Sequence, residues 1–437
     1  MKKANPALLA LVAEGFLMRL GYGIIAFALP LYARHLGLNL AETGALLALT
    51  GVVKVALKPL TGWLADRVGP KRGLVTALGL RSLVSLLFVF ASAPWQLYSI
   101  RTIHGLSTSV RDPALNALIA ENGDEKEMAS AFAWYFTAKS LANSLGKAVA
   151  GVLLTLTGSN FSAVFLVTWV ISSLTLPAVI LFVPEVDRKR LAEQLKEMRD
   201  RAPAGGERRD NETAGVGLGF LISVTGSMID RFYPILATEY AGMTDAQAGM
   251  VYVASALVAL VAGPLFGWMS DQVGRKPTVA VRSMANAMSS LLYLFVPSGA
   301  GFTVGKLLDD GGRAGFRPAW GAVKADVSGV DRSQRARMMG IMDVGDDAGD
   351  VVGPIGGGFL WETWGIVGLV STRIALAGLT EVYAAAVMWR RPKGRRATTR
   401  RGRDRMRALR HARWLRWRRR LGREPAAEAS PHDRALL

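Results

Sequence analysis

The chain has 437 residues, of which 51% are hydrophobic and 20% charged, and it contains no cysteine. This composition is too apolar, and its apolar runs are too long, for a single soluble domain, and without cysteine there is no disulfide framework or thiolate metal site. The net charge of +19 comes largely from the arginine-dense segment after Trp389. The composition therefore predicts a membrane protein.

Apolar segments of about 20 residues, the length that crosses the hydrocarbon core of a bilayer, recur along the chain. They predict six membrane-spanning helices in each half. The first six lie at residues 7–32, 41–64, 74–92, 95–120, 129–155 and 161–183. The second six lie at residues 214–238, 246–269, 278–297, 300–326, 336–360 and 366–389. The predicted domains are an N-terminal bundle at 1–184, a cytoplasmic linker at 185–213, a C-terminal bundle at 214–390 and a basic tail at 391–437.

Basic residues gather in alternate connections between the predicted spans. They occur at 67–72, 188–201, 275–276 and 332–337, whereas the intervening connections are short and nearly uncharged. By the positive-inside rule, both termini and the basic connections lie in the cytoplasm. We expect an integral protein of a bacterial inner membrane, present as a monomer.

One short motif occurs once in each half. Residues 62–72, GWLADRVGPKR, return as residues 267–277, GWMSDQVGRKP, 205 positions further along the chain. The same shift pairs Asp112-Pro113-Ala114 with Arg317-Pro318-Ala319. The repetition predicts a duplicated helical bundle.

The pattern G-x-L-x-D-R-x-G-x-K-R between the second and third spans resembles the signature loop of the major facilitator superfamily of secondary transporters, and the second copy resembles it more weakly. The resemblance implies an all-α membrane protein with twelve transmembrane helices in two pseudo-symmetric six-helix bundles. A purely topogenic basic loop is the alternative for both copies. The candidate signature and gating residues are Gly62, Asp66, Arg67, Gly69, Lys71, Arg72, Gly267, Asp271, Gly274, Arg275 and Lys276.

Ionisable residues inside membrane spans are functional candidates, because placing each of them in hydrocarbon is costly. Glu14 loosely resembles the acid in the first helix of some drug/proton antiporters, and structural pairing with Arg101 or Arg81 is the alternative. Arg101-x-x-x-Gly105 resembles the arginine motif of the fourth helix that the family associates with proton coupling. The candidates for substrate binding or proton coupling are Glu14, Arg19, Arg101, Asp230, Asp309, Asp310 and Arg313.

The eleventh predicted span carries four aspartates spaced i, i+3, i+4 and i+7, which places them on one stripe of a helix. In the family that the chain resembles, helix two meets helix eleven, so the lysines of the second span should face this stripe. We expect an ion-pair zipper on the cytoplasmic side, in which a proton on one carboxylate weakens the pairing and favours the other state. A static seam is the alternative. The zipper residues are Lys54, Lys58, Asp343, Asp346, Asp347 and Asp350.

Three further features bear on partners. Four carboxylates on one stripe also suit a divalent cation, which is the less favoured interpretation because the facing lysines would repel it. The arginine-rich tail suits anionic lipid headgroups, whereas no recognition fold accompanies it that would indicate nucleic-acid binding. No ATP-binding loop, zinc helix or hydrolase elbow occurs, so we expect neither an enzyme nor a cofactor.

The sequence thus predicts a proton-coupled secondary active transporter that moves a small organic solute by alternating access, with export slightly favoured over import. Gly146-Lys147 in the fifth span departs from the Gly-Pro pair of many drug exporters, which leaves uptake open. The alternatives are a carrier of a divalent metal ion or metal complex, a nutrient importer and, least favoured, a non-transporting membrane scaffold.

Overall fold

A computed structural model describes residues 6–122, 128–185, 209–272, 275–328 and 335–389. Within these ranges nearly every residue is helical, and no strand occurs there. Residues Met1–Ala384 form one compact unit, and Ala385–Leu437 form a second. The helices described below build the first unit, except for residues 385–389 at the end of the last helix, which belong to the second.

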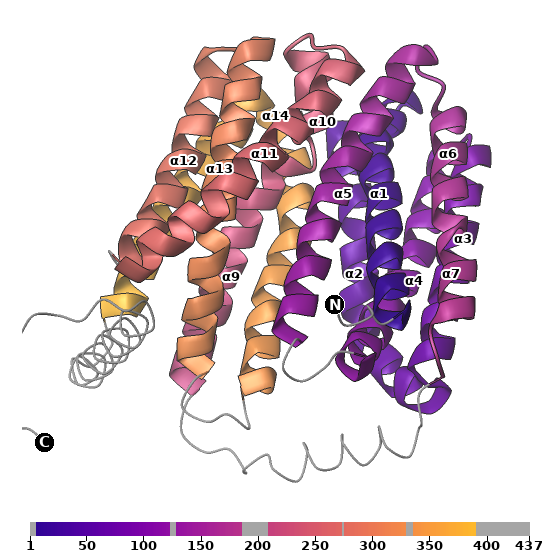
Figure 1. Ribbon diagram of the computed structural model, residues 1–437. Helices are drawn as coiled ribbons and strands as arrows, with labels where there is room; N and C mark the ends of the chain where they lie inside the picture. Colours follow the sequence, from indigo (N-terminus) through magenta and orange to yellow (C-terminus); the bar gives the residue numbers. More distant parts are fainter. Residues whose placement is uncertain (1–5, 123–127, 186–208, 273–274, 329–334, 390–437) are drawn as a thin grey trace, which may run out of the picture. The chain divides into compact units, whose positions relative to one another are not determined.

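The first half of the chain, called the N half, forms seven helices, which Figure 1 shows in indigo to magenta. Their bounds are α1 Pro6–His35, α2 Leu40–Val68, α3 Pro70–Phe90, α4 Pro94–Asn122, α5 Met128–Leu156, α6 Phe161–Ser173 and α7 Thr175–Phe182. The sixth predicted span is thus broken at Leu174. Pro177 explains the break, because it has no N–H to donate to the carbonyl of Ser173.

The second half, called the C half, begins with a helix that ends early. Its elements are α9 Arg209–Asp230, α10 Tyr233–Ile235, the π-helical turn η1 Leu236–Tyr240, α11 Asp245–Gln272, α12 Arg275–Phe295, α13 Gly299–Ser328 and α14 Arg335–Trp389. The predicted seventh span, 214–238, is not one continuous helix. It stops at Asp230, whose carbonyl Pro234 cannot bond. The last two predicted spans run on as α14 across a kink at Gly365, where φ is 65° and ψ is −170°.

The connection that carries the first signature motif is shorter than expected. Helix α2 continues to Val68 and α3 begins at Pro70, so Gly69 alone separates them. Its φ of 89° is a backbone conformation that glycine adopts at little cost. Pro70 suits the first position of α3, since its fixed φ fits a helix and the missing N–H has no partner there anyway. The predicted loop is therefore mostly the last turns of α2.

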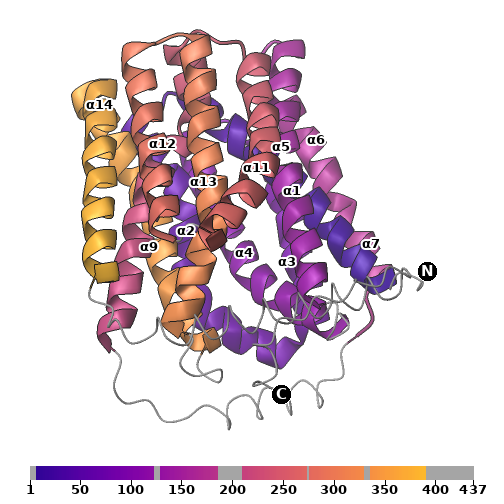
Figure 2. The ribbon, with the colours of Figure 1, turned by 60° about the vertical axis from the view of Figure 1, so that its left-hand side comes forward.

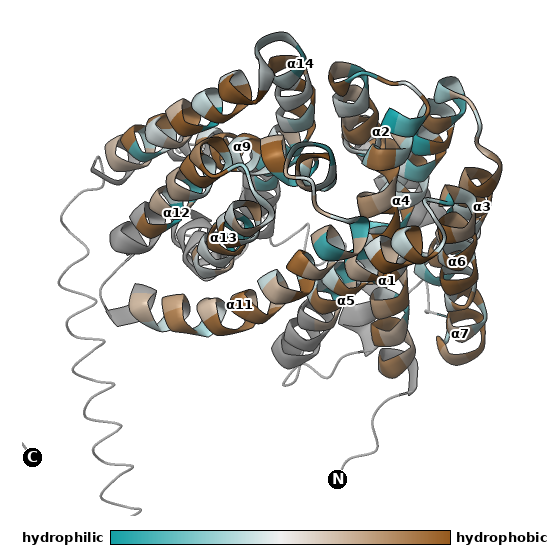
Figure 3. Ribbon diagram, turned by 90° about the horizontal axis from the view of Figure 1, so that it is seen from above, coloured by the Kyte–Doolittle hydropathy of each residue, from teal (hydrophilic) through white to brown (hydrophobic). Residues whose placement is uncertain are grey.

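Six helices among the described residues are long and apolar enough to cross a membrane. They contain residues Leu9–His35, Leu40–Leu57, Pro70–Phe90, Phe161–Phe182, Asp245–Phe266 and Asp343–Ala386. Large apolar side chains on these helices are exposed, among them Phe90, Leu181 and Val261. Figure 3 shows apolar residues on much of α3, α6 and α11. Such surfaces suit lipid, and helices suit it too because they satisfy their own backbone hydrogen bonds.

The two halves begin α2 and α11 with the same capping arrangement. The Asn39 amide N–H donates to the Glu42 carboxylate, and the Glu42 amide N–H donates to the Asn39 side chain, both at 2.8 Å. In the C half, Thr244 and Gln247 exchange equivalent bonds of 2.9 and 3.2 Å. These reciprocal capping boxes satisfy amides at the start of each helix. They are 205 positions apart, as the sequence repeat is.

Close backbone contacts join the halves along two helix pairs. A Cβ added at Gly44 of α2 would lie 2.3 Å from the carbonyl oxygen of Pro354 in α14, and one at Gly358 would lie 2.4 Å from the carbonyl oxygen of Leu40. A Cβ added at Gly151 of α5 would lie 2.2 Å from the carbonyl oxygen of Asp245, at the start of α11. Figure 2 shows α5 and α11 side by side. The seam therefore joins predicted helix two to eleven and helix five to eight, as the resemblance implied.

Candidate functional site

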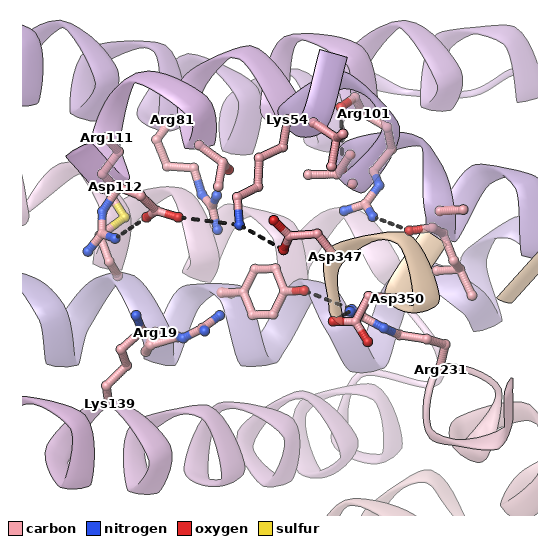
Figure 4. A pocket seen from close by; sticks show the side chains of 18 residues that line it. Arg19, Lys54, Arg81, Arg101, Arg111, Asp112, Lys139, Arg231, Asp347 and Asp350 are labelled. Carbon is pink, nitrogen blue, oxygen red and sulfur yellow. Dashed lines mark hydrogen bonds and ion pairs between the residues drawn. The ribbon is translucent and has the colours of Figure 1, made fainter. Parts of the chain in front are cut away.

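A cavity of about 200 Å³ lies among α1, α2, α4 and α5 of the N half, with Arg231, Asp347 and Asp350 of the C half in its wall (Figure 4). Its lining is strongly charged. The cationic lining residues are Arg19, Lys54, Arg81, Arg101, Arg111, Lys139 and Arg231, and the acidic ones are Asp112, Asp347 and Asp350.

Two polar contacts across this cavity join the halves. The Lys54 ammonium lies between two carboxylates, 3.5 Å from Asp347 of α14 and 3.9 Å from Asp112 of its own half (Figure 4). Arg231 donates to the Tyr22 hydroxyl at 2.9 Å. Within the C half, the same guanidinium lies 4.0 Å from Asp350. The Lys54 and Asp347 side chains are 31% and 25% exposed, so their pair stabilises the contact between the two halves by only about 0–1 kcal/mol.

The predicted zipper residues are thus brought together in part. Lys54 meets Asp347, as expected from the seam, whereas Asp350 meets Arg231 of its own half. Asp343 and Asp346 lie on the same helix, with Asp343 exposed. The side chain of Lys58 lies outside the described residues.

Glu14 is fully buried and forms a bidentate ion pair. Its two carboxylate oxygens accept from Nε and Nη2 of Arg111 in α4, each at 2.9 Å. Arg101 or Arg81 was the alternative expected as a structural partner, and that expectation was wrong. The helix repeat explains why, since Arg111 lies ten residues beyond Arg101 and so at a different depth of the bundle. Arg19 lines the cavity and stacks on the Tyr22 ring, 4.9 Å from its centre.

A second cluster, in the wall of the cavity, contains two guanidinium groups and one imidazole. Nη1 of Arg81 contacts Nε2 of His104, and Nη1 of Arg101 lies 3.4 Å from Nδ1 of the same ring. Arg101 also donates to the carbonyls of Leu46 and Leu47, at 3.3 and 2.8 Å. Neither Arg81 nor Arg101 forms an ion pair with a described residue.

The C half holds a buried cluster with as many carboxylates as cations. Lys306 lies 2.6 Å from Asp230 and 3.0 Å from Asp310. Arg313 lies 3.5 Å from Asp230 and 3.3 Å from Asp309. The structure thus brings together Asp230, Asp309, Asp310 and Arg313, four of the residues predicted for coupling.

Arg373 completes this cluster and was missed in the sequence analysis. It is fully buried, lies 2.8 Å from Asp309, and donates to Ser289 and Ser290 at 3.1 and 3.0 Å. Arg373 lies inside an apolar predicted span, and a charged residue in such a place indicates a functional or structural role. The sequence pattern indicated Arg81 only as a partner for Glu14, and it did not indicate Tyr22 or His104. For His104, the 205-residue repeat was the available signal, since it aligns this residue with Asp309.

The signature residues are described only in part. Lys71 donates to the carbonyl of Ile180 at 3.2 Å, and Arg72 lies 2.8 Å from Glu185 in an exposed ion pair. Only the backbone is described at Gly62, Asp66, Arg67, Gly267, Asp271, Arg275 and Lys276. Gly274, residues 186–208 of the linker and residues 390–437 of the tail lie outside the described residues. Their predicted roles stay predictions.

No group of three or more acidic or histidine side chains that could hold a metal ion occurs among the described residues. The partners of Asp347 and Asp350 are cations, as the preceding distances show. The described part of the chain therefore offers no support for the divalent-cation alternative.

The described residues thus form an all-helical bundle with two sequence repeats and a charged cavity lined by residues of both halves. The sequence profile of the Major Facilitator Superfamily matches residues 13–228 and again 215–427. The chain belongs to this family, which confirms the predicted family and the all-α membrane fold. The chain is thus an integral membrane protein of this superfamily.

Curated relatives match part of the chain. Multidrug resistance protein MdtG of Citrobacter koseri is 30% identical over 169 residues, or 38% of this chain and 41% of the relative. MdtG of Enterobacter lignolyticus is 29% identical over 170 residues, 38% of this chain and 40% of the relative. The chain thus matches less than half the length of these relatives.

Solved structures share the fold over most of the chain. The nucleoside transporter NupG superposes with a TM-score of 0.68 at 15% identity, covering 88% of this chain and 100% of that one. A POT family transporter in complex with 5-aminolevulinic acid gives a TM-score of 0.70 at 13% identity, covering 89% and 96%. At such identities the likeness concerns the fold alone.

Proposed function

We propose that this protein is a proton-coupled secondary transporter that exports a small organic solute by alternating access. The observation that carries the proposal is the Lys54–Asp347 ion pair, 3.5 Å long, which joins the two halves at the wall of the cavity. A pair of this exposure contributes about 0–1 kcal/mol, so a proton on Asp347 would weaken the contact between the halves by up to that amount and shift the balance toward the other arrangement.

The opposite end of the bundle supports the same proposal. Near the start of α2, Arg34 lies 3.4 Å from Glu239, and the Leu40 amide donates to Glu362 at 2.8 Å. Both contacts join the N half to the C half. The two halves therefore touch at this end of the bundle in the same structure that contains the cavity. Alternating access requires that these outer contacts break when the cavity opens to the other side.

The balanced cluster of the C half is the second candidate for proton coupling. Asp230 accepts from Lys306 and lies beside Arg313, so its charge is held by two cations. A proton on Asp230 would release Lys306 from one of its two carboxylates and leave an excess of positive charge in a buried site. Binding a proton and repacking the cluster are therefore linked.

The direction and setting of transport are supported less directly. Two matched relatives bear the name multidrug resistance protein, which supports export of drug-like compounds. The basic connections support cytoplasmic termini in a bacterial inner membrane, with the tail on anionic headgroups. We propose a monomer, and no metal cargo.

The test is transport by the purified full chain in proteoliposomes with an imposed pH gradient. Ethidium and carboxyfluorescein serve as cationic and anionic dyes, and an internal pH indicator reports proton flux. We expect the wild type to couple dye movement to proton flux, and we expect Asp347→Asn and Asp230→Asn to lose the coupling. Glu185→Gln is the matched control, since it removes an exposed carboxylate away from the cavity.

Unchanged coupling in both aspartate variants would remove the proposed role of these carboxylates. Dye uptake driven in the opposite direction would identify an importer. No dye or proton flux in any sample, with folded protein, would favour the scaffold alternative.

A further inference from the structure

The cavity carries an excess of positive charge. Glu14 lies beside the lining and pairs with Arg111, so four carboxylates face seven cationic side chains among the described residues. Like charges brought this close repel one another strongly where water is scarce. A cavity of this kind attracts a ligand of opposite charge.

The excess is concentrated where Arg81 and Arg101 meet His104. All three residues are buried, with exposed fractions of 6%, 4% and 0%. An imidazole offers at most one accepting nitrogen, so it satisfies only one of the two guanidinium groups that approach it. The site therefore has more hydrogen-bond donors than acceptors.

The repeat shows what fills the equivalent place in the C half. A shift of 205 residues aligns Arg101 with Lys306 and His104 with Asp309. In the C half, Asp309 lies 2.8 Å from Arg373 and 3.3 Å from Arg313, so a carboxylate of the protein neutralises the cations. In the N half the corresponding residue is a histidine, and no carboxylate of a described residue takes that role for Arg81 or Arg101.

We infer that the cavity binds its solute as an anion, whose carboxylate or phosphoryl group is held by Arg81 and Arg101 at the cavity wall and supplies the negative charge that Asp309 supplies in the C half. The inference rests on the proposed function, because it takes this cavity to be the transport site. The cavity volume of about 200 Å³ suits a small organic anion. Tyr22 lines the same cavity, and Arg81 lies over its ring, 5.6 Å from the centre.

The experiment measures binding without any gradient, by the thermal unfolding of the full chain in nanodiscs of neutral lipid at constant ionic strength. The probes are phenyl phosphate, benzoate and inorganic phosphate, with phenyltrimethylammonium as a cation of similar size. We expect the anions to raise the melting temperature with increasing concentration and the cation to leave it unchanged, because only a ligand of the folded state stabilises it.

Two variants test the site. Arg81→Gln removes one donor group, and we expect the affinity for phenyl phosphate to fall at least about tenfold, the effect of losing a charge-assisted hydrogen bond. His104→Asp supplies the carboxylate that the C half already has. We expect this variant to keep or raise its melting temperature without ligand and to lose anion binding by at least about tenfold, a combination that a misfolded variant cannot give.

Arg34→Gln is the control, because it removes a partly exposed arginine that does not line the cavity. The inference is overturned if the cation stabilises the protein as well as the anions do, if none of the anions stabilises it, or if both cavity variants bind phenyl phosphate as the wild type does. Anion binding without proton-driven flux would leave the inference standing and contradict the proposed function. Proton-driven flux of ethidium without anion binding would contradict the inference and leave the proposed function standing.

Discussion

The pairing of Glu14 with Arg111 separates two roles that one buried acid could have. A carboxylate that exchanges protons with a solute needs access to water or to the solute. Glu14 is fully buried, and both of its oxygens are held by one guanidinium in a planar, bidentate geometry. The contacts favour a structural role, in which Glu14 neutralises one cation of the cavity wall and fixes α1 against α4.

Removing this carboxylate should therefore cost stability. We expect Glu14→Gln to lower the free energy of unfolding by about 3–5 kcal/mol, since Arg111 would keep a buried charge without its partner. Glu239→Gln breaks an exposed ion pair and should cost less than about 1 kcal/mol. Thermal unfolding of the three proteins in the same detergent measures the difference, and equal losses in the two variants would contradict the structural role.

The charged residues inside the helices could be predicted from the sequence, whereas their partners could not. The sequence identified Glu14, Asp230, Asp309 and Arg313 because charged residues inside apolar segments are unusual. It did not identify the partner of Glu14, because a contact between helices depends on the rotation and depth of both. Those are set by packing along the whole helix, and no local pattern records them.

At the scale of the helices, the contact between α2 and α14 depends on the absence of side chains. Gly44 and Gly358 let the two backbones approach until a Cβ would lie 2.3–2.4 Å from a carbonyl oxygen of the other helix. Only glycine avoids this clash. The contact between the two helices at this end therefore requires glycine at both positions.

Gly358→Leu should prevent this contact. A leucine there cannot fit against Leu40 and Phe232, so we expect the variant to populate the state in which this end is open. The chain has no cysteine, so Leu40→Cys introduces a unique thiol. We expect a membrane-impermeant maleimide to label this thiol at least about tenfold faster in the Gly358→Leu background, since a shift of about 1.4 kcal/mol between two states changes their ratio tenfold. Gly356→Leu is the control, because a Cβ at Gly356 meets no atom within 4 Å; equal labelling rates in the two backgrounds would contradict the argument.

The helix boundaries could be predicted in general and not in detail. Runs of apolar residues gave each helix its approximate place, since length and hydrophobicity decide what crosses a bilayer. The interruptions at Leu174 and after Asp230 were not predicted, although Pro177 and Pro234 stand in the sequence. Proline inside membrane helices is often tolerated, so its presence alone does not fix a break.

At the scale of the whole molecule, the two halves repeat each other in structure and differ in charge. The capping boxes at Asn39 and Thr244 occupy equivalent positions in the two halves, and so do the cationic residues Arg101 and Lys306. The sequence alone predicted this duplication from two signature motifs. It did not predict that the described residues give Arg81 and Arg101 no carboxylate partner while Asp309 pairs with Arg313 and Arg373, because that difference appears only when the contacts of His104 and Asp309 are compared.

Alternating access predicts that a bond across the outer contact stops transport. The pair Arg34→Cys and Glu239→Cys replaces a cross-half ion pair with two thiols, and a short thiol-reactive cross-linker should abolish dye transport while a reducible linker should allow recovery after reduction. The control pair is Ser82→Cys and Ser173→Cys, whose hydroxyls are 2.6 Å apart within the N half. Loss of transport with the control alone, or persistence of transport with the outer cross-link, would contradict the rocking of two halves.

The cluster of Arg81, His104 and Arg101 has a consequence for the unloaded transporter. Electroneutrality requires that counter-ions from the surrounding solution accompany a surplus of fixed positive charge. If the cavity binds anions as inferred, chloride or phosphate from the buffer competes with the cargo there, and cargo binding becomes an exchange of one ion for another. Dissociation constants measured for this protein will change with the identity of the buffer anion as well as with ionic strength.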